Sequence, residues 1–220
     1  MSETPVNSSE TGRRRYRSPK RAARALETRR RIRMAAEVLF LRDGYARTTM
    51  TAVARAAGVV EKTVYLVFPT KAALLNEVIV TAVRGEDARR PLAERHRAAL
   101  AAPPLELLAR FGELHADVMA RTARVMALGE SASSVDPQLA VLRDRGHASM
   151  RGAFTEIARS LDAHGALPAG VTIDDAADTI YALANESVYL RLIDGCGWAP
   201  DRYAEWLTRV LKGALLASVG

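Results

Sequence analysis

Residues 48–71 have the sequence "TTMTAVARAAGVVEKTVYLVFPTK", in which two short helical patterns flank a glycine. The first pattern follows Thr48 and Thr49, and either side chain can accept a hydrogen bond from the free amides at a helix start. Gly58 breaks this pattern, and a second one covers residues 61–67 until Pro69 stops it. Neither helix is long enough to bury much surface by itself. Apolar residues at helical spacing give the inward faces, with Met50, Val53, Ala54 and Ala57 in the first helix and Val64 and Phe68 in the second.

The flanking sequence extends the helical pattern in both directions. Upstream, a helix is predicted from about Ala25, with an apolar stripe over residues 32–40 and Gly44 as the residue that ends it. Downstream, Thr70 precedes the apolar run "KAALLNEVIVTAVR" as a helix cap. Proline and capping-box signals start further helices near residues 104, 137 and 173, and a last helix is predicted over residues 201–217. Since no strand-like alternation persists, the predicted fold class is all-α.

Charge is distributed unevenly along the 220 residues. Residues 1–24 carry seven Lys or Arg against two Asp or Glu, residues 25–84 carry ten against five, and the rest carry fifteen against eighteen. Residues 1–24 also lack an apolar period, so they are predicted to form a disordered basic arm. A basic front joined to a slightly acidic body indicates a polyanion-binding segment.

Composition narrows the class of protein further. Hydrophobic residues make up 49% and charged residues 26%, which is typical of a folded globular chain. No run approaches the roughly 18 uncharged apolar residues of a membrane span, and no apolar signal-peptide segment is visible. Cys196 is the one cysteine, so no internal disulfide can form. These features favour a cytoplasmic protein without a membrane partner.

Two helices joined by a tight turn that contains glycine, within a basic segment, predict a helix-turn-helix that binds DNA. The second helix is too short to contribute much to a core, but it fits a major groove about 12 Å wide. Lys62 can reach guanine or phosphate, Thr63 offers a hydroxyl and a methyl group, and Tyr65 can donate to phosphate. Lys71, at the start of the next helix, would add a phosphate contact. Tyr65 packing against the first helix, and Thr49 serving only as a cap, are the structural alternatives.

The run "GYARTTMTAVARAAGVVEKTVYLVFPTKAALL" resembles the DNA-binding segment of the tetracycline-repressor (TetR) family. The matching features are the Gly-Tyr turn, the paired threonines, "AAGV", "KTVY", "FPTK" and "ALL", and the resemblance covers residues 28–75. Three positions depart from the family pattern, because Val60 replaces the usual Ser or Thr cap, Leu66 the common His, and Val67 the common aromatic residue. Leu66 can contact a thymine methyl group or merely fill a gap. The resemblance assigns DNA contacts to Thr49, Thr51, Lys62, Thr63, Tyr65 and Lys71, and Leu66 lies beside them as a further candidate.

The resemblance also implies the domain organisation. It predicts a three-helix DNA-binding domain over residues 25–72 and a helical domain over residues 73–220 that binds a small ligand and dimerises through its last two helices. Both helices are apolar on more than one side, which indicates a partner subunit or ordinary burial. Bulky or polar residues that would surround the ligand are Phe111, His115, Met119, Met126, Phe154, Tyr181 and Asn185, although such a cluster is also typical of plain core.

Together these features predict a homodimeric regulator, most simply a repressor, that binds a palindromic operator in double-stranded DNA and is released by a hydrophobic or amphipathic small molecule. The histidines have no metal-ligand spacing, and no phosphate-binding glycine loop or nucleophile elbow is present, so no metal, cofactor or enzymatic activity is predicted. Two alternatives remain from sequence. One is a sequence-nonspecific DNA-binding protein that relies on its basic arm, and the other is a helical enzyme with a vestigial DNA-binding domain.

Overall fold

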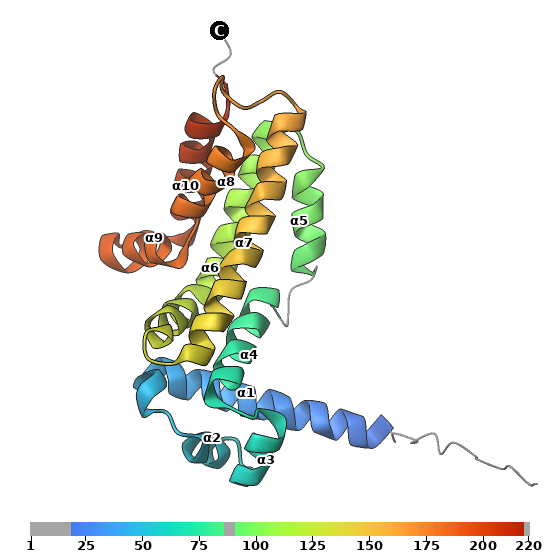
Figure 1. The fold of residues 1–220 in the computed structure, drawn as a ribbon, viewed down its shortest axis with the longest axis vertical. Helices are drawn as coiled ribbons and strands as arrows, with labels where there is room; N and C mark the ends of the chain where they lie inside the picture. Colours follow the sequence, from blue (N-terminus) through green and yellow to red (C-terminus); the bar gives the residue numbers. More distant parts are fainter. Residues whose placement is uncertain (1–18, 86–90, 218–220) are drawn as a thin grey trace, which may run out of the picture.

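The computed structural model describes residues 19–85 and 91–217, and every regular element in those ranges is helical (Figure 1). The all-α prediction is therefore confirmed. The elements are α1 (Pro19–Arg47), α2 (Met50–Ala56), α3 (Glu61–Val67), α4 (Lys71–Arg84), α5 (Leu92–Leu100), α6 (Pro104–Ser133), α7 (Pro137–Ala163), α8 (Ile173–Leu183), α9 (Glu186–Leu190), a π-helical turn (Arg191–Gly195) and α10 (Pro200–Leu215). None of these helices is by itself long and apolar enough to cross a membrane, and α3 with α4 meets that criterion only as a pair bent by 64°.

The first four helices form a small unit at one end of the molecule (Figure 1). Helix α1 begins at Pro19, six residues before the predicted start, so the end of the predicted arm is helical; residues 1–18 lie outside the described residues. Gly44 interrupts α1 with φ of 81°, in the left-handed region that ends a helix. Thr49 caps α2 and Thr70 caps α4, each accepting from the amide three residues on.

The core of this unit extends past the predicted domain boundary at residue 72. Val64 of α3 is fully buried, and Leu74, Leu75 and Val78 of α4 join the same cluster. Residues of the long helices α6 and α7 also enter it, since Leu139 is only 3% exposed there. Helix α4 is therefore shared between the DNA-binding unit and the body, and packing couples the two.

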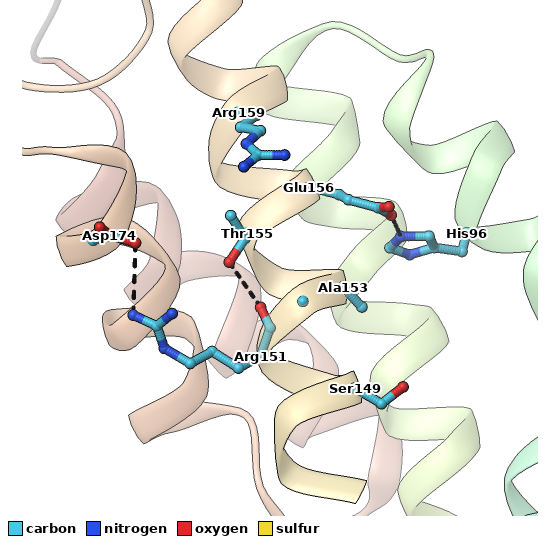
Figure 2. Close-up of a pocket in the computed structure, with 9 residues that line it drawn as sticks. His96, Ser149, Arg151, Ala153, Thr155, Glu156, Arg159 and Asp174 are labelled. Atoms are coloured by element: carbon cyan, nitrogen blue, oxygen red, sulfur yellow. Dashed lines mark hydrogen bonds and ion pairs between the residues drawn. The ribbon is translucent and has the colours of Figure 1, made fainter. Parts of the chain in front are cut away.

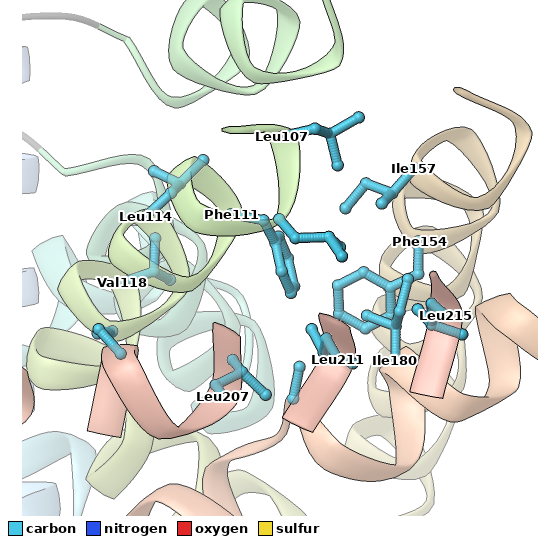
Figure 3. Close-up of a cluster of buried hydrophobic side chains, with 14 of the residues drawn as sticks. Leu107, Phe111, Leu114, Val118, Phe154, Ile157, Ile180, Leu207, Leu211 and Leu215 are labelled. Carbon is cyan, nitrogen blue, oxygen red and sulfur yellow. The ribbon is translucent and has the colours of Figure 1, made fainter. Parts of the chain in front are cut away.

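The body is a bundle built around α6, the longest helix. Side chains from α6, α7, α8 and α10 interdigitate in its core, as Figure 3 shows for Phe111, Phe154, Ile180 and Leu207. Helices α6 and α10 cross closely at Gly112, because a methyl group there would lie 2.9 Å from the carbonyl oxygen of Ala204. Burial of this many apolar side chains makes the hydrophobic effect the main stabilising force of the bundle.

The penultimate helix is broken, which differs from the continuous helix that the sequence predicts over residues 174–193. Helix α8 ends at Leu183, Ala184 has non-helical angles (φ −98°, ψ 71°), and Asn185 caps the five-residue α9. Figure 1 shows α9 projecting sideways from the bundle. A side-chain cap at Asn185 and the acidic Glu186 in the first turn of α9 explain locally why a new helix starts here.

Candidate DNA interface and effector core

Helix α3 presents one face to solvent and one to the core. Val64 is fully buried, whereas Tyr65 is 47% and Leu66 is 78% exposed. Lys62 is also exposed, and Thr63 is half-buried beside it. The exposed face thus combines a cation, a hydroxyl, a phenol and an apolar side chain, a set able to contact both phosphates and base edges. Tyr65 is nearly half exposed, so part of its side chain is accessible from solvent.

The start of α2 lies beside the start of α3. Thr49 uses its side-chain oxygen to accept from the Ala52 amide, 3.1 Å away, and the residue remains exposed. Thr51 donates to the Glu61 carboxylate at 2.8 Å, which links the first turns of the two helices. Glu61 is thereby held by a hydrogen bond, and its acceptor oxygens are partly occupied. The two threonines stay available at the surface as predicted contacts.

Two arginines of α1 hold the helix-turn-helix in place, a role that the sequence did not reveal. Arg31 donates to the carbonyls of Ala57 and Gly58 at the turn that follows α2. Arg29 donates to the Val67 carbonyl at the end of α3 and pairs with Glu77 at 2.9 Å. Cations near helix C-termini satisfy free carbonyls and oppose the negative end of the helix dipole. Both side chains therefore hold α3, the helix expected to enter the major groove and here called the recognition helix, from its α1 side.

Lys71 has a structural role in place of the predicted phosphate contact. Its ammonium donates to the carbonyls of Tyr45 at 2.8 Å and Thr48 at 3.1 Å, with a longer contact to Ala46, and lies 4.2 Å from the centre of the Tyr45 ring. An ammonium has three donors, so these carbonyls occupy them all. By contrast, Lys62 and Arg55 are exposed, and within the described ranges neither side chain forms a hydrogen bond or ion pair. Arg55, on α2, is a candidate phosphate contact that the sequence analysis missed.

Two polar connections join the DNA-binding unit to the body. The Tyr45 hydroxyl donates to Asp136 at 2.6 Å, and the same carboxylate caps α7 by accepting from the Gln138 amide. The bond to Tyr45 is the largest influence that lowers the pKa of Asp136, and burial followed by this bond raises the pKa of Tyr45. On the other side, Arg121 of α6 donates to the Ala82 carbonyl at 3.1 Å near the end of α4. These bonds connect α7 directly to α1 and α6 directly to α4.

The structure brings most of the predicted ligand residues together inside the body. Phe111, His115, Met119 and Phe154 are buried in one cluster, and Met126 and Tyr181 pack against it half-buried. The rings of Phe111 and Phe154 meet edge to face with centres 5.7 Å apart, and Phe154 and Tyr181 lie 6.5 Å apart. The cluster is a tightly packed aromatic core to which α6, α7 and α8 contribute.

Asn185 was predicted among the ligand residues, but it does not belong to this cluster. Its side-chain oxygen accepts from the Val188 amide at 2.9 Å, and its nitrogen donates to the Ala182 carbonyl at 2.9 Å. The helix break places the side chain at a helix start, where both ends of the amide are satisfied by backbone.

Two surface hollows of about 680 Å³ each lie on the body, and neither is lined by the predicted ligand residues. Figure 2 shows the first, where His96 of α5 meets Glu156 of α7 at 3.1 Å and Arg151 bridges to Asp174 of α8. Its exposed ion pairs contribute little to stability. The second lies between α6 and α10 over Thr208, near the close crossing at Gly112.

Comparison with known proteins identifies the family. Residues 32–78, which comprise most of α1 and all of α2 and α3, match the family model described as bacterial regulatory proteins, tetR family. These residues form a TetR-family DNA-binding segment. A search of curated protein sequences gave no match. Within the TetR family these helices are the DNA-binding segment, so the chain is a DNA-binding transcriptional regulator.

Solved structures of TetR-family regulators resemble the whole chain. NalD, the secondary repressor of a multidrug efflux pump in Pseudomonas aeruginosa, is 26% identical with a TM-score of 0.71, and the match covers 89% of this chain and 99% of NalD. A putative transcriptional regulator from Saccharomonospora viridis in complex with choline is 21% identical with a TM-score of 0.68 (88% and 100% covered). SmeT in complex with triclosan is 20% identical with a TM-score of 0.69 (87% and 93% covered). The last two likenesses concern the fold.

The TetR-family neighbours are regulators and not enzymes, which rules against the enzymatic alternative. Within residues 19–85 and 91–217, no group of three or more His, Cys, Asp or Glu side chains is arranged to hold a metal ion. Cys196 is exposed in the loop between the π-helical turn and α10.

Proposed function

We propose that this TetR-family regulator binds a palindromic operator as a homodimer, acts as a repressor, and is released by a small hydrophobic or amphipathic effector. Binding to an operator is supported by the solvent-facing side of α3, where Lys62, Tyr65 and Leu66 are exposed. Thr63 lies half-buried beside them. Arg29 and Arg31 fix this face from behind. A pre-organised recognition helix binds without a large ordering cost.

The proposed division of labour within the interface follows from the chemistry of each side chain. Lys62 and Arg55 contact phosphates and supply affinity, whereas Thr63 and Leu66 contact base edges and supply specificity. The hydroxyl groups of Thr49, Thr51 and Tyr65 contact the sugar-phosphate backbone of the DNA and position the domain on it. Lys71 stabilises the end of α1 and contributes only indirectly.

The proposed dimer forms through α8, α9 and α10. Half-buried apolar side chains on this side of the body support it, among them Leu183, Ile193 and Trp206. A partner subunit would cover them and gain hydrophobic stabilisation. Two recognition helices in a dimer must be spaced by roughly 34 Å to enter successive major grooves. Sedimentation of the protein with and without Ile193→Asp tests the dimer, and a variant that remains dimeric contradicts this interface.

The proposed effector acts through the connections between body and DNA-binding unit. A ligand that displaces α6 or α7 shifts Arg121 and Asp136, which hold α4 and Tyr45. Such a ligand releases the operator only if it prefers one spacing of the two recognition helices. Triclosan in one structural neighbour and choline in another support a small organic effector.

The experiment that tests the operator proposal compares two variants on DNA selected from a random pool. Thr63→Ala is expected to reduce the preference for selected over scrambled DNA by about 1–3 kcal/mol. Lys62→Ala is expected to weaken binding to both DNAs by the same factor. Glu156→Ala, on the far side of the body, is the matched control and should change neither. Equal loss of both DNAs with Thr63→Ala would contradict base recognition by α3.

A further inference from the structure

His115 of α6 has a buried nitrogen without a partner. Its Nε2 is the one buried side-chain nitrogen or oxygen in the described ranges that forms no hydrogen bond, and the residue is only 6% exposed. A buried donor or acceptor without a partner is destabilising, so native proteins rarely contain one without a reason. A bound ligand that pairs with this atom would supply the reason.

The other ring nitrogen determines which proton His115 carries. Nδ1 lies 3.2 Å from the hydroxyl of Tyr203, a side chain of α10 that is fully buried. That hydroxyl proton has no other acceptor among the described residues, so we assign Tyr203 as the donor and Nδ1 as the acceptor. The neutral ring therefore keeps its proton on Nε2, which becomes an unpaired donor. Burial lowers the pKa of His115 to about 4, against a smaller opposing effect of the Ala184 carbonyl, so the ring is uncharged at neutral pH.

Aromatic rings surround this donor on several sides. The ring of Phe111 lies 5.6 Å from that of His115, and Phe154 continues the series across to α7. On the other side, Tyr203 lies 5.9 Å from His115, and Tyr189 of α9 lies 4.9 Å from Tyr203. None of these side chains carries a charge at neutral pH. A single polar donor set in an aromatic wall is the usual composition of a site for a small organic molecule.

Helical hydrogen bonding is interrupted beside His115, at the break between α8 and α9. The backbone of Ala184 at this break acts as a hydrogen-bond acceptor that opposes the lowering of the His115 pKa, but it does not reach normal hydrogen-bond geometry with Nε2. An opening of the packed core at this break would disrupt fewer helical hydrogen bonds than an opening elsewhere along α8.

We propose that His115 anchors an uncharged aromatic effector by donating a hydrogen bond from Nε2 to an oxygen of the ligand. This inference rests on the proposed function, since it specifies the class of effector that the body accepts. A neutral donor in an uncharged wall disfavours a cation, and nothing in the wall neutralises an anion. The ring system of the ligand would replace contacts between Phe111, Phe154 and Tyr181, and its oxygen would face Nε2.

The test uses two matched probes, 2-naphthol and naphthalene, which differ by one hydroxyl group, with choline as a cationic comparator. Binding to the full-length protein is measured by titration calorimetry and by quenching of Trp206, whose ring lies 5.8 Å from Tyr203. The wild type should bind 2-naphthol about tenfold more tightly than naphthalene, the effect of one buried neutral hydrogen bond. His115→Leu should remove that difference, and His115→Gln, which keeps an N–H donor, should restore part of it. His96→Leu, a histidine of the surface hollow, is the control and should bind like the wild type.

Several results would overturn the inference. These are equal affinity of the wild type for the two naphthyl probes, an unchanged preference in His115→Leu, tighter binding of choline, or no binding of any probe. Thermal unfolding of each variant shows whether it remains folded. Operator affinity is measured in the same samples, so the two proposals can fail separately. Binding of 2-naphthol through His115 without a change in operator affinity supports the site and contradicts the effector mechanism, whereas operator release that is unaffected by His115→Leu supports the mechanism and contradicts the site.

Discussion

A comparison of Lys71 with Lys62 distinguishes a lysine that stabilises the DNA-binding unit from one that contacts DNA. Both are lysines next to the recognition helix, yet Lys71 donates to the carbonyls of Tyr45 and Thr48 at 2.8 and 3.1 Å, whereas Lys62 is exposed without a partner among the described residues. Replacing each with Met retains most of the apolar stem and removes the charge. The structure predicts opposite consequences for the two variants.

Lys71→Met should lower the free energy of unfolding by about 2 kcal/mol. Charge-assisted hydrogen bonds contribute about 1.5–3 kcal/mol each when buried, and the cation–π contact with Tyr45 adds about 0.5–1 kcal/mol. Lys71 is half-buried, and the released carbonyls can bind water, so the net loss falls well below the sum of these contributions. Urea unfolding followed by circular dichroism measures this change. Lys62→Met should leave the free energy of unfolding within about 0.5 kcal/mol of the wild type.

The salt dependence of operator binding gives the complementary result. Each phosphate contact contributes about 0.9 to the slope of log affinity against log salt concentration. Lys62→Met should reduce the slope by that amount per subunit, whereas Lys71→Met should leave the slope unchanged under conditions where the variant is folded. A reduced slope for Lys71→Met with unchanged stability would refute the capping role and restore the phosphate contact that the sequence predicts.

Three further predictions concern packing and pH. Gly112→Ala should lower the free energy of unfolding by about 1–3 kcal/mol, since its methyl carbon would lie 2.9 Å from an α10 carbonyl oxygen; Gly146→Ala, with open space around it, is the control, and equal effects would contradict the tight crossing. Tyr45→Phe should reduce the loss of stability in acid. The folded-state pKa of Asp136 is depressed below 3.8, so its contribution to the free energy of unfolding is present above pH 3.8 and lost as pH falls through the folded pKa. An equal decline of the melting temperature in acid for the variant and the wild type would argue against this. The pKa of His115 falls from 6.5 to about 4 on folding, so between these pH values the unfolded chain takes up a proton that the folded chain does not. The free energy of unfolding should therefore decline as pH drops from 6.5 to 4, and His115→Leu should lack this decline in urea unfolding. A difference in the free energy of unfolding between the two proteins that stays constant with pH would contradict this.

The sequence predicted the helix-turn-helix closely because its signals are local. Thr49 and Thr70 cap their helices as expected, Gly44 adopts a positive φ that interrupts α1, and α3 spans the predicted residues 61–67. Val60 provides no side-chain cap, also as expected. Each of these features depends on residues within one helical turn, so a single sequence contains the necessary information.

The features that sequence did not predict depend on contacts across the fold. Lys71 reaches a carbonyl 26 residues away and Arg29 one 38 residues away, so charges that look like a DNA-binding surface are partly used as internal caps. The break at Ala184 lacks both glycine and proline, which hid it within a helical pattern. Asn185 followed by Glu186 was a usable signal, because Asn is a favoured cap and an acid in the first turn stabilises a helix start.

The same limit applies to the candidate effector core. Helical spacing placed Phe111, His115 and Phe154 on inward faces, and the structure brings them into one cluster. Spacing could not show that Tyr203, 88 residues away, meets Nδ1 of His115 and leaves Nε2 unpaired. That arrangement follows only from the packing of α10 on α6.

Specific recognition of DNA by a dimer is tested most directly by the affinity of the full-length protein for a selected operator and for operators with one or both half-sites scrambled, at two salt concentrations. We expect a palindromic selected sequence that binds about a thousandfold or more tightly than fully scrambled DNA. We also expect that scrambling one half-site removes much of that preference. Equal affinity for all three DNAs, with the same steep loss as salt rises, would contradict specific dimeric recognition and indicate sequence-independent binding through the basic residues.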